Sequence, residues 1–197
     1  MQLCFATNNA HKLDEAKAIL SGQCKIVSLR DIGCDQELAE DFDTLEKNAK
    51  QKAQFIYDHY KIDCFADDTG LEVEALGGAP GVYSARYSGL PPDSHKNVSL
   101  LLDNLRQVEN RRARFRTVIA LILGGKEYFF EGILSGSIQQ TRSGANGFGY
   151  DPIFLPNGYS KTLAEMTAQE KNAISHRALA LRKTYQFLHK LEKSLHP

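Results

Sequence analysis

Two extended segments joined by a pair of glycines, the first with alternating residue types, constrain the fold of this chain more than any other feature. Between residues 113 and 119, apolar residues alternate with Arg114 and Arg116, and Gly124-Gly125 separates this segment from a second extended one at 126–138. A period of two is typical of a strand with one buried face, and a glycine pair between two such segments is typical of a hairpin turn. The sequence therefore predicts a long β-hairpin whose arginines, Arg111, Arg112, Arg114 and Arg116, share one exposed face.

Segments with helical spacing flank this hairpin, together with two short apolar strands predicted at 3–6 and 62–66. Apolar residues step by three and four in the segments 11–20, 43–60, 98–105 and 167–188. Asp43 with Glu46, and Thr167 with Glu170, have the spacing of capping boxes, so a helix is expected to open at each. We find no internal repeat, low-complexity segment or linker. The prediction is a single α/β domain over residues 1–197, with helices packed around a mixed sheet.

Composition excludes several classes of function. The 197 residues carry 24 basic and 24 acidic side chains, so no net positive field is present to hold a nucleic-acid backbone. The N-terminus lacks a basic region followed by a long apolar run, and no segment approaches the roughly 20 apolar residues of a membrane span. The four cysteines show no C-x-x-C spacing and are expected to be reduced. We expect a cytoplasmic protein that binds neither nucleic acid nor membrane.

Two adjacent carboxylates, Asp67 and Asp68, follow the apolar strand predicted at 62–66, in the sequence F-A-D-D-T-G-L. A strand that ends there would hold both carboxylates on a rigid support at the edge of a sheet. Magnesium in proteins takes one or two carboxylates together with substrate phosphates, so the pair fits a metal-assisted hydrolase. The alternative is an ordinary acidic turn before a glycine. A nearby acidic loop contains Glu37, Glu40 and Asp41. These residues either lie on the solvated surface or supply a further metal ligand.

A polar turn, Thr7-Asn8-Asn9, follows the first predicted strand and opens a helix that carries Lys12 in its first turn. Backbone N–H groups and the positive end of the helix dipole at such a junction form an anion site, and a lysine there can reach a phosphate. An ordinary capped turn with a solvated lysine is the alternative. Because the segment is not a Walker loop, the local sequence alone does not decide between them.

Two further segments carry residues suited to recognising a base. Phe148 and Asp151 occur in a glycine-rich loop, where an aromatic ring can stack on a base and a carboxylate can hydrogen-bond to it, although aromatics beside glycine also belong to cores. A basic cluster at the start of the last predicted helix is, by its residues alone, typical of a solvated face with a structural histidine. Its residues are Lys171, Ser175, His176 and Arg177. The glycines at 77–81 are assigned a shaping role only.

The chain resembles the HAM1-like nucleoside triphosphate pyrophosphatases, the inosine/xanthosine triphosphatase family, from residue 3 to about residue 182, and five ordered motifs carry the resemblance. They are T-N-N-A-H-K at 7–12, F-A-D-D-T-G-L at 65–71, G-G-A-P-G at 77–81, F-G-Y-D-P-I-F at 148–154 and S-H-R at 175–177. The resemblance implies a two-lobed fold with a long mixed sheet and a central substrate cleft. It also implies magnesium-dependent hydrolysis of ITP, dITP and XTP to the monophosphate and pyrophosphate, which removes deaminated purines from the nucleotide pool, and a homodimer.

The resemblance also assigns roles to residues. Asp68 is implied as proton acceptor and magnesium ligand, with Glu40 as the second ligand, and Thr69 takes the place of a serine. Asn8 stands where the family usually has glycine; asparagine tolerates positive φ, so we expect the turn to persist. The implied substrate contacts are Thr7, Asn8, Asn9, Ala10, His11, Lys12, Thr69, Phe148, Gly149, Tyr150, Asp151, Lys171, Ser175, His176 and Arg177.

Two other functions remain open from the sequence. One is a pyrophosphatase of the related Maf-type fold that acts on pyrimidine or methylated nucleotides. The other is a nucleotide-binding regulator that does not hydrolyse its ligand, which would be stabilised by nucleotide without releasing pyrophosphate. The intact acidic pair favours an enzyme.

Overall fold

The computed structural model describes residues 2–195 and divides them into two compact units. Residues 2–68, 117–132 and 176–195 form the first unit, and residues 69–116 and 133–175 form the second. The strands hydrogen-bond in the order β2-β1-β3-β5-β6-β7, and β4 pairs with β3. Parallel and antiparallel neighbours both occur, so the predicted α/β fold with a mixed sheet is confirmed.

The first unit begins with a strand, a helix and a second strand. β1 (Gln2–Phe5) pairs in parallel with β2 (Lys25–Val27) and with β3 (Cys64–Val73), whose first residues belong to this unit. Parallel neighbours need a crossover connection, and helices supply it here. The helices are α1 (Ala10–Ile19), α2 (Leu45–Tyr60) and α5 (His176–Leu195), with a short 3₁₀ turn at Arg30–Ile32.

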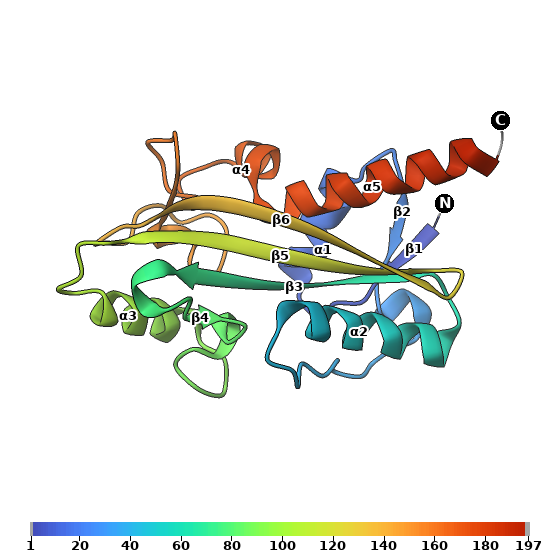
Figure 1. The fold of residues 1–197 in the computed structure, drawn as a ribbon, viewed down its shortest axis with the longest axis horizontal. Coiled ribbons are helices and arrows are strands. Elements are labelled where there is room, and N and C mark those ends of the chain that lie inside the picture. The colour runs from blue at the N-terminus through green and yellow to red at the C-terminus, as the bar shows by residue number, and fades with distance from the viewer. Residues whose placement is uncertain (1, 196–197) are drawn as a thin grey trace. The chain divides into compact units, whose positions relative to one another are not determined.

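Helices cover both faces of the strands of the first unit, with α2 on one side and α5 on the other (Figure 1). Side chains alternate along each strand, so Cys4 and Cys64 pack with α2 while Phe5 and Phe65 pack with α1 and α5. The two phenylalanine rings stack with their centroids 4.5 Å apart. This alternation decides which face each carboxylate of β3 can reach.

The second unit has its own apolar core and more 3₁₀ and loop structure. Leu71 of β3, Phe115 of β5 and Phe154 of β7 pack there with the apolar face of α3. β3 pairs antiparallel with β4, and β6 pairs antiparallel with β7. Its elements are 3₁₀ turns at Glu74–Leu76, Ser84–Arg86 and Asp151–Ile153, β4 (Pro80–Gly81), α3 (Ser94–Asn104), β7 (Phe154–Pro156) and α4 (Ala168–Ile174).

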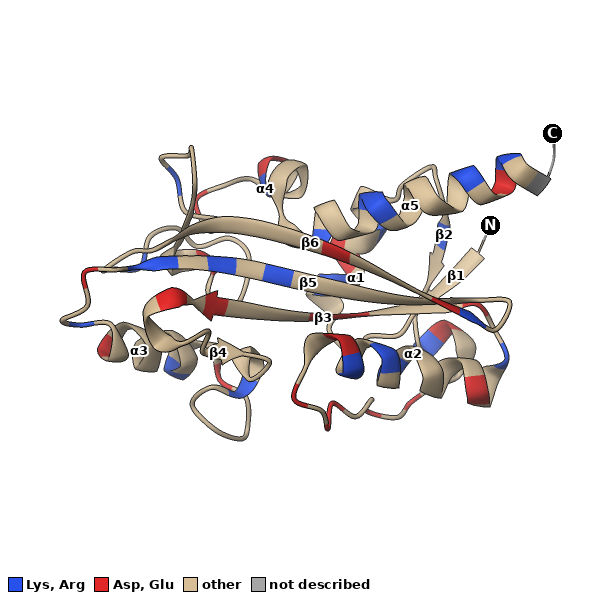
Figure 2. Ribbon diagram, in the orientation of Figure 1, with Lys and Arg blue, Asp and Glu red and all other residues tan. Residues whose placement is uncertain are grey.

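The predicted hairpin is confirmed: β5 (Arg112–Leu123) and β6 (Lys126–Ile138) flank Gly124-Gly125, and both glycines have positive φ. Arg112 and Arg114 are exposed between buried neighbours, and the basic residues of β5 are visible as separate blue bands (Figure 2). Arg111 departs from this pattern. Its guanidinium donates to three backbone carbonyls, those of Leu105, Ile138 and Gln139.

The prediction that an apolar strand ends at Asp67 is wrong, because β3 continues through both aspartates to Val73. Leu71 and Val73 are buried and restore the apolar pattern beyond the charged pair. Gly70 lets the antiparallel partner come close, since a Cβ there would lie 2.6 Å from the carbonyl oxygen of Gly81. The carboxylates therefore lie in the interior of a strand rather than at its end.

Two helix predictions also need correction. The helix expected over 167–188 is interrupted at Ser175, whose extended backbone (φ −62°, ψ 151°) separates α4 from α5 and has the conformation of an N-cap residue. The capping box of Thr167 with Glu170 is confirmed. The box predicted for Asp43 is wrong, because Thr44 caps α2 by accepting from the amide of Lys47 at 3.3 Å.

The cysteines are free thiols, and Cys4, Cys34 and Cys64 are buried, as predicted. Over residues 2–195, no helix has both the length and the apolar character needed to cross a bilayer.

Candidate active site

Asp67 lies at the centre of a buried charge cluster in the first unit. Its carboxylate accepts from Lys12 Nζ at 3.0 Å and from Arg177 Nε at 3.0 Å, and its side chain has no exposed surface. Burial alone would raise the pKa of Asp67, but Lys12, Arg177 and Lys52 outweigh it and hold that pKa well below the usual range. Asp67 is therefore a fixed anion, neutralised by cations from α1 and α5.

Asp68 meets a different environment because adjacent strand residues point to opposite faces. Its Oδ2 accepts from Asn48 Nδ2 of α2 at 3.1 Å. Burial raises the pKa of Asp68, and the attraction of Lys52 and Lys12 only partly opposes this. A carboxylate with a raised pKa is a better proton acceptor, so of the two aspartates Asp68 has the properties of a general base.

A loop before α2 brings Glu40 toward this pair. Lys52 Nζ makes a short contact with Glu40 and donates to the backbone carbonyl of Asp67 at 2.8 Å. Burial would raise the pKa of Glu40, but Lys52 outweighs it and the pKa falls below its usual value. Asn48 bonds both backbone groups of Phe42, at 2.8 and 3.2 Å, so the loop and Asp68 share one amide side chain.

The polar turn after β1 forms as predicted, with one difference. Thr7 Oγ1 accepts from the amide of Asn9, and Asn9 caps α1 by accepting from the amide of Lys12, each at 3.2 Å. Asn8 does not adopt positive φ; Lys61 is the only non-glycine residue that does within residues 2–195. Its side chain instead donates to the carbonyl of Gln36 at 3.1 Å and accepts from the amide of Leu38 at 3.0 Å.

Lys12 and Arg177 are less exposed than the sequence suggested. The Lys12 side chain is 13% exposed and paired with Asp67, rather than solvated. Arg177 is 1% exposed, and its guanidinium also makes a short contact with Glu15 of α1. Burial would lower the pKa of Arg177, but Asp67 and Glu15 outweigh it and raise that pKa. The neighbouring His176 is buried as well.

The second unit contains a separate cluster built on the loop at 147–151. Asp151 Oδ2 accepts from Lys171 Nζ at 2.7 Å and from the amide of Phe148 at 2.9 Å. Lys171 Nζ lies over the Phe148 ring, 4.7 Å from its centroid. Gly147 has positive φ, and a Cβ there would overlap the Asp151 carboxylate. The cluster therefore depends on a glycine, an ion pair and one ring.

The second unit also contains four other predicted site residues: Tyr150, Gly149, Ser175 and Thr69. Tyr150 is buried and donates to the carbonyl of Ser84 at 2.9 Å, which makes it a core residue. Gly149 has positive φ, and Ser175 is fully buried with its amide bonded to the carbonyl of Lys171. Thr69 directly follows Asp68 on β3 and is half-buried.

The sequence analysis did not identify Glu15, Asn48 or Lys52. A signal for the last two was present: Asn48 and Lys52 lie one turn apart among the inward-facing positions of α2, beside Ala49 and Ala53. A buried lysine and a buried asparagine on an apolar helix face need polar partners, and the carboxylates of β3 and the loop provide them.

Hard oxygen donors are available for a divalent cation in the first unit. Lys52 contacts both Glu40 and the backbone carbonyl of Asp67, and Asp68 is the next residue along β3. Two carboxylates with phosphate oxygens match the way Mg²⁺ is usually bound. No group of three or more His, Cys, Asp or Glu side chains is arranged as a metal site in the described part of the chain. A pair of carboxylates fits an ion whose other ligands come from a substrate.

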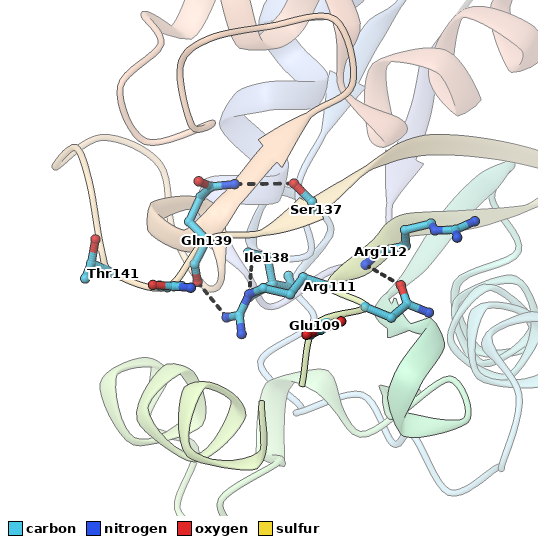
Figure 3. A pocket seen from close by; sticks show the side chains of 9 residues that line it. Glu109, Arg111, Arg112, Ser137, Ile138, Gln139 and Thr141 are labelled. Carbon is cyan, nitrogen blue, oxygen red and sulfur yellow. Dashed lines mark hydrogen bonds between the residues drawn. The ribbon is translucent and has the colours of Figure 1, made fainter. Parts of the chain in front are cut away.

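A surface hollow of about 730 Å³ lies in the second unit, and none of the predicted site residues lines it (Figure 3). Arg111 lines it, but its guanidinium is held by the carbonyls named above, two of which are drawn in the figure. The hollow is lined by Glu109, Asn110, Arg111, Arg112, Ser137, Ile138, Gln139, Gln140 and Thr141.

Comparison with known proteins gives one consistent result. Residues 3–187 match the model of the Ham1 family. The chain is 52% identical over 188 residues to a dITP/XTP pyrophosphatase of Porphyromonas gingivalis, covering 95% of this chain and 97% of the relative. It is 48% identical over 190 residues to a dITP/XTP pyrophosphatase of Christiangramia forsetii, covering 96% of this chain and 100% of the relative.

Solved structures agree with these relatives. The Ham1 protein of Staphylococcus aureus superposes with a TM-score of 0.87 at 35% identity, covering 96% of this chain and 99% of that one. A dITP/XTP pyrophosphatase of Mycobacterium abscessus gives a TM-score of 0.75 at 42% identity, covering 93% and 98%. The chain belongs to the Ham1 family.

Proposed function

We propose that this protein hydrolyses the triphosphates of deaminated purines, ITP, dITP and XTP, between the α- and β-phosphates to give the monophosphate and pyrophosphate. Relatives named dITP/XTP pyrophosphatase support the substrate class. The observation that carries the chemistry is the contrast between adjacent carboxylates, one fixed as an anion and one with a raised pKa. A Maf-type activity and a non-hydrolytic regulator are not favoured.

In the proposed reaction, Asp68 accepts a proton from the attacking water. Lys12 and the turn at 7–12 hold the phosphates, and Asn48 keeps the Asp68 carboxylate in place by donating to one of its oxygens. When bound, a divalent cation such as Mg²⁺ would be held by Glu40 and Asp68 and would neutralise phosphate charge. Fixing Asp68, the general base, relative to a bound substrate avoids the entropy cost of bringing the two together in solution.

Recognition of the base is assigned to residues of the second unit, with Phe148 as the stacking ring. The ring is half-buried, and its loop is fixed by Asp151. Stacking on an aromatic ring tolerates any base, so it supplies affinity rather than selectivity. Selectivity for hypoxanthine and xanthine must come from hydrogen-bond donors that face the oxygen at position 6, where adenine carries an amino donor.

Two further expectations accompany this proposal. We expect the protein to act in the cytoplasm, because that is where a role in the general nucleotide pool would be exercised. The family resemblance supports a homodimer, which a sedimentation measurement would test.

The test of the function is pyrophosphate release measured across ITP, dITP, XTP, ATP, GTP and dTTP. A buried polar mismatch can cost a factor of up to roughly 10⁴–10⁵, so we expect kcat/KM for ITP and XTP to exceed that for ATP and GTP by at least about 10². Comparable turnover of ATP and ITP would contradict the assignment and leave a general nucleotide pyrophosphatase. Preference for dTTP would point to the Maf-type alternative.

A further inference from the structure

The ion pair between Lys171 and Asp151 is almost completely withdrawn from solvent. Asp151 is 2% exposed and Lys171 is 5% exposed, and they meet at 2.7 Å. Burying two charges is costly unless each is paired and further hydrogen-bonded. Further partners are therefore expected around this pair, and they indicate what the pair holds in place.

Both members of the pair contact Phe148. The same Asp151 oxygen that accepts from Lys171 also accepts from the amide of Phe148, which fixes the backbone that carries the ring. Lys171 Nζ lies 4.7 Å from the centroid of that ring, within the range of a cation–π contact. Backbone and ring of Phe148 are therefore held by two members of a single ion pair.

Backbone hydrogen bonds hold the loop around Phe148. The amide of Asn146 donates to the carbonyl of Ala164 at 3.0 Å, and the amide of Ala164 donates to the carbonyl of Asp151 at 3.2 Å. Gly144 and Gly147 lie where a Cβ would overlap Ala164 and Asp151 respectively. These glycines permit close packing, so the glycine-rich loop is held against the segment before α4.

We propose that Asp151 and Lys171 are positioning residues that hold the Phe148 ring ready to stack on the purine base. The proposal rests on the base-stacking role given to Phe148 above. Lys171 then contributes to nucleotide affinity through the ring rather than by contacting phosphate. Asp151 acts through the Phe148 amide rather than by bonding the base directly.

A double-mutant cycle separates this proposal from direct contact. Phe148→Leu, Lys171→Gln and the combined variant are compared with the wild type for KM and kcat on ITP. If Lys171 acts through the ring, each single change raises KM about tenfold, with kcat within about threefold, and the combined variant stays within about threefold of Phe148→Leu. Lys171→Arg, which keeps the charge and the cation–π contact, should return KM to within about threefold of wild type.

A second measurement uses ligands that carry only part of the substrate. Binding of IMP should weaken in Lys171→Gln, whereas binding of inorganic tripolyphosphate, which has no base, should not change. Multiplicative effects on KM, weaker tripolyphosphate binding, or an unchanged KM in Phe148→Leu would each overturn the proposal. Both ligands report without turnover, so a wild type that released no pyrophosphate would count against the proposed hydrolysis, while IMP binding by the wild type, the two single variants and the combined variant would still test the positioning role.

Lys171→Gln leaves the Asp151 carboxylate buried without its cation, and this variant can fail to fold. In that case Asp151→Asn combined with Lys171→Gln removes both charges and retains one side-chain oxygen that can accept from the Phe148 amide. This neutral pair should still weaken IMP binding, because the cation over the ring is gone. If the folded neutral pair binds IMP as the wild type does, the proposal is wrong.

Discussion

The two units each bury a lysine–aspartate pair, and the pairs differ in what surrounds them. Lys12 and Asp67 belong to a cluster in which Arg177, Glu15 and Lys52 also take part. Lys171 and Asp151 have the backbone and the ring of Phe148 as further partners. The same pair of residue types is thus used once to set charge around a reacting carboxylate and once to fix an aromatic ring.

The difference shows why a buried ion pair alone does not reveal its role. In the first unit, the strand directs Asp67 to one face and Asp68 to the other, so the cations that neutralise Asp67 leave Asp68 with a raised pKa. No second carboxylate follows Asp151 in the sequence, where Pro152 stands instead. The role of each pair follows from its next neighbour along the chain.

Asp68→Asn gives the largest expected effect on activity. The change removes the proton acceptor while keeping the shape and the contact with Asn48, so kcat for ITP should fall by about 10²–10⁴-fold. Because burial raises the pKa of Asp68, its charged form is unfavourable in the folded protein, and the variant should melt no lower than the wild type. A variant that keeps more than about a tenth of wild-type kcat would show that Asp68 is not the base.

Asp67→Asn should have the opposite outcome, with stability as its main loss. It removes the anion between Lys12 and Arg177, and breaking a buried ion pair costs about 3–5 kcal/mol in the free energy of unfolding. Chemical denaturation of Asp67→Asn and Asp151→Asn gives a matched comparison, in which we expect Asp67→Asn to lose more because the contacts of two cations, Lys12 and Arg177, with this carboxylate are weakened. Equal losses would mean that the larger cluster adds nothing to the fold.

The dependence on pH sharpens the same comparison. The pKa of Asp67 is depressed in the folded state, so its contribution to stability is present above the ordinary aspartate value of 3.8 and is lost as pH falls toward the depressed pKa. The stability of Asp67→Asn should therefore depend less on pH than that of the wild type over this acidic range. Parallel pH profiles for the two proteins would contradict the ionisation assigned to Asp67.

Local patterns in the sequence predicted the elements whose signal is contained in a few neighbouring residues. The hairpin at Gly124-Gly125 and the capping box at Thr167 and Glu170 are examples. The end of β3 could not be placed in this way. Its continuation past Asp68 depends on cations from α1, α2 and α5, which make buried charge tolerable in a strand and lie far away in sequence.

The candidate site was predictable in its residue types more than in its contacts. The motifs gave Lys12, Asp68 and Phe148, but not that Arg177 would be held by Asp67 and Glu15. Such pairings join residues more than a hundred positions apart, and no periodicity encodes them. Asn8 is a further case, because a tolerated positive φ was expected and a pair of side-chain hydrogen bonds is found instead.

Asn8→Gly gives the smallest expected effect. Asn8 joins the turn at 7–12 to the segment before Glu40 through its bonds to Gln36 and Leu38, and an exposed hydrogen bond contributes only about 0.5–1.5 kcal/mol. We expect amide hydrogen exchange at Leu38 to rise about fivefold in the glycine variant. Asn9→Ala is the matched control, since it removes the cap of α1 one residue away without touching that segment. If Leu38 exchanges at the wild-type rate in Asn8→Gly, or equally fast in both variants, the loop that carries Glu40 is held by the α2 side chains alone. The position of Glu40 would then be set by α2, and the polar turn would have no part in placing this second carboxylate.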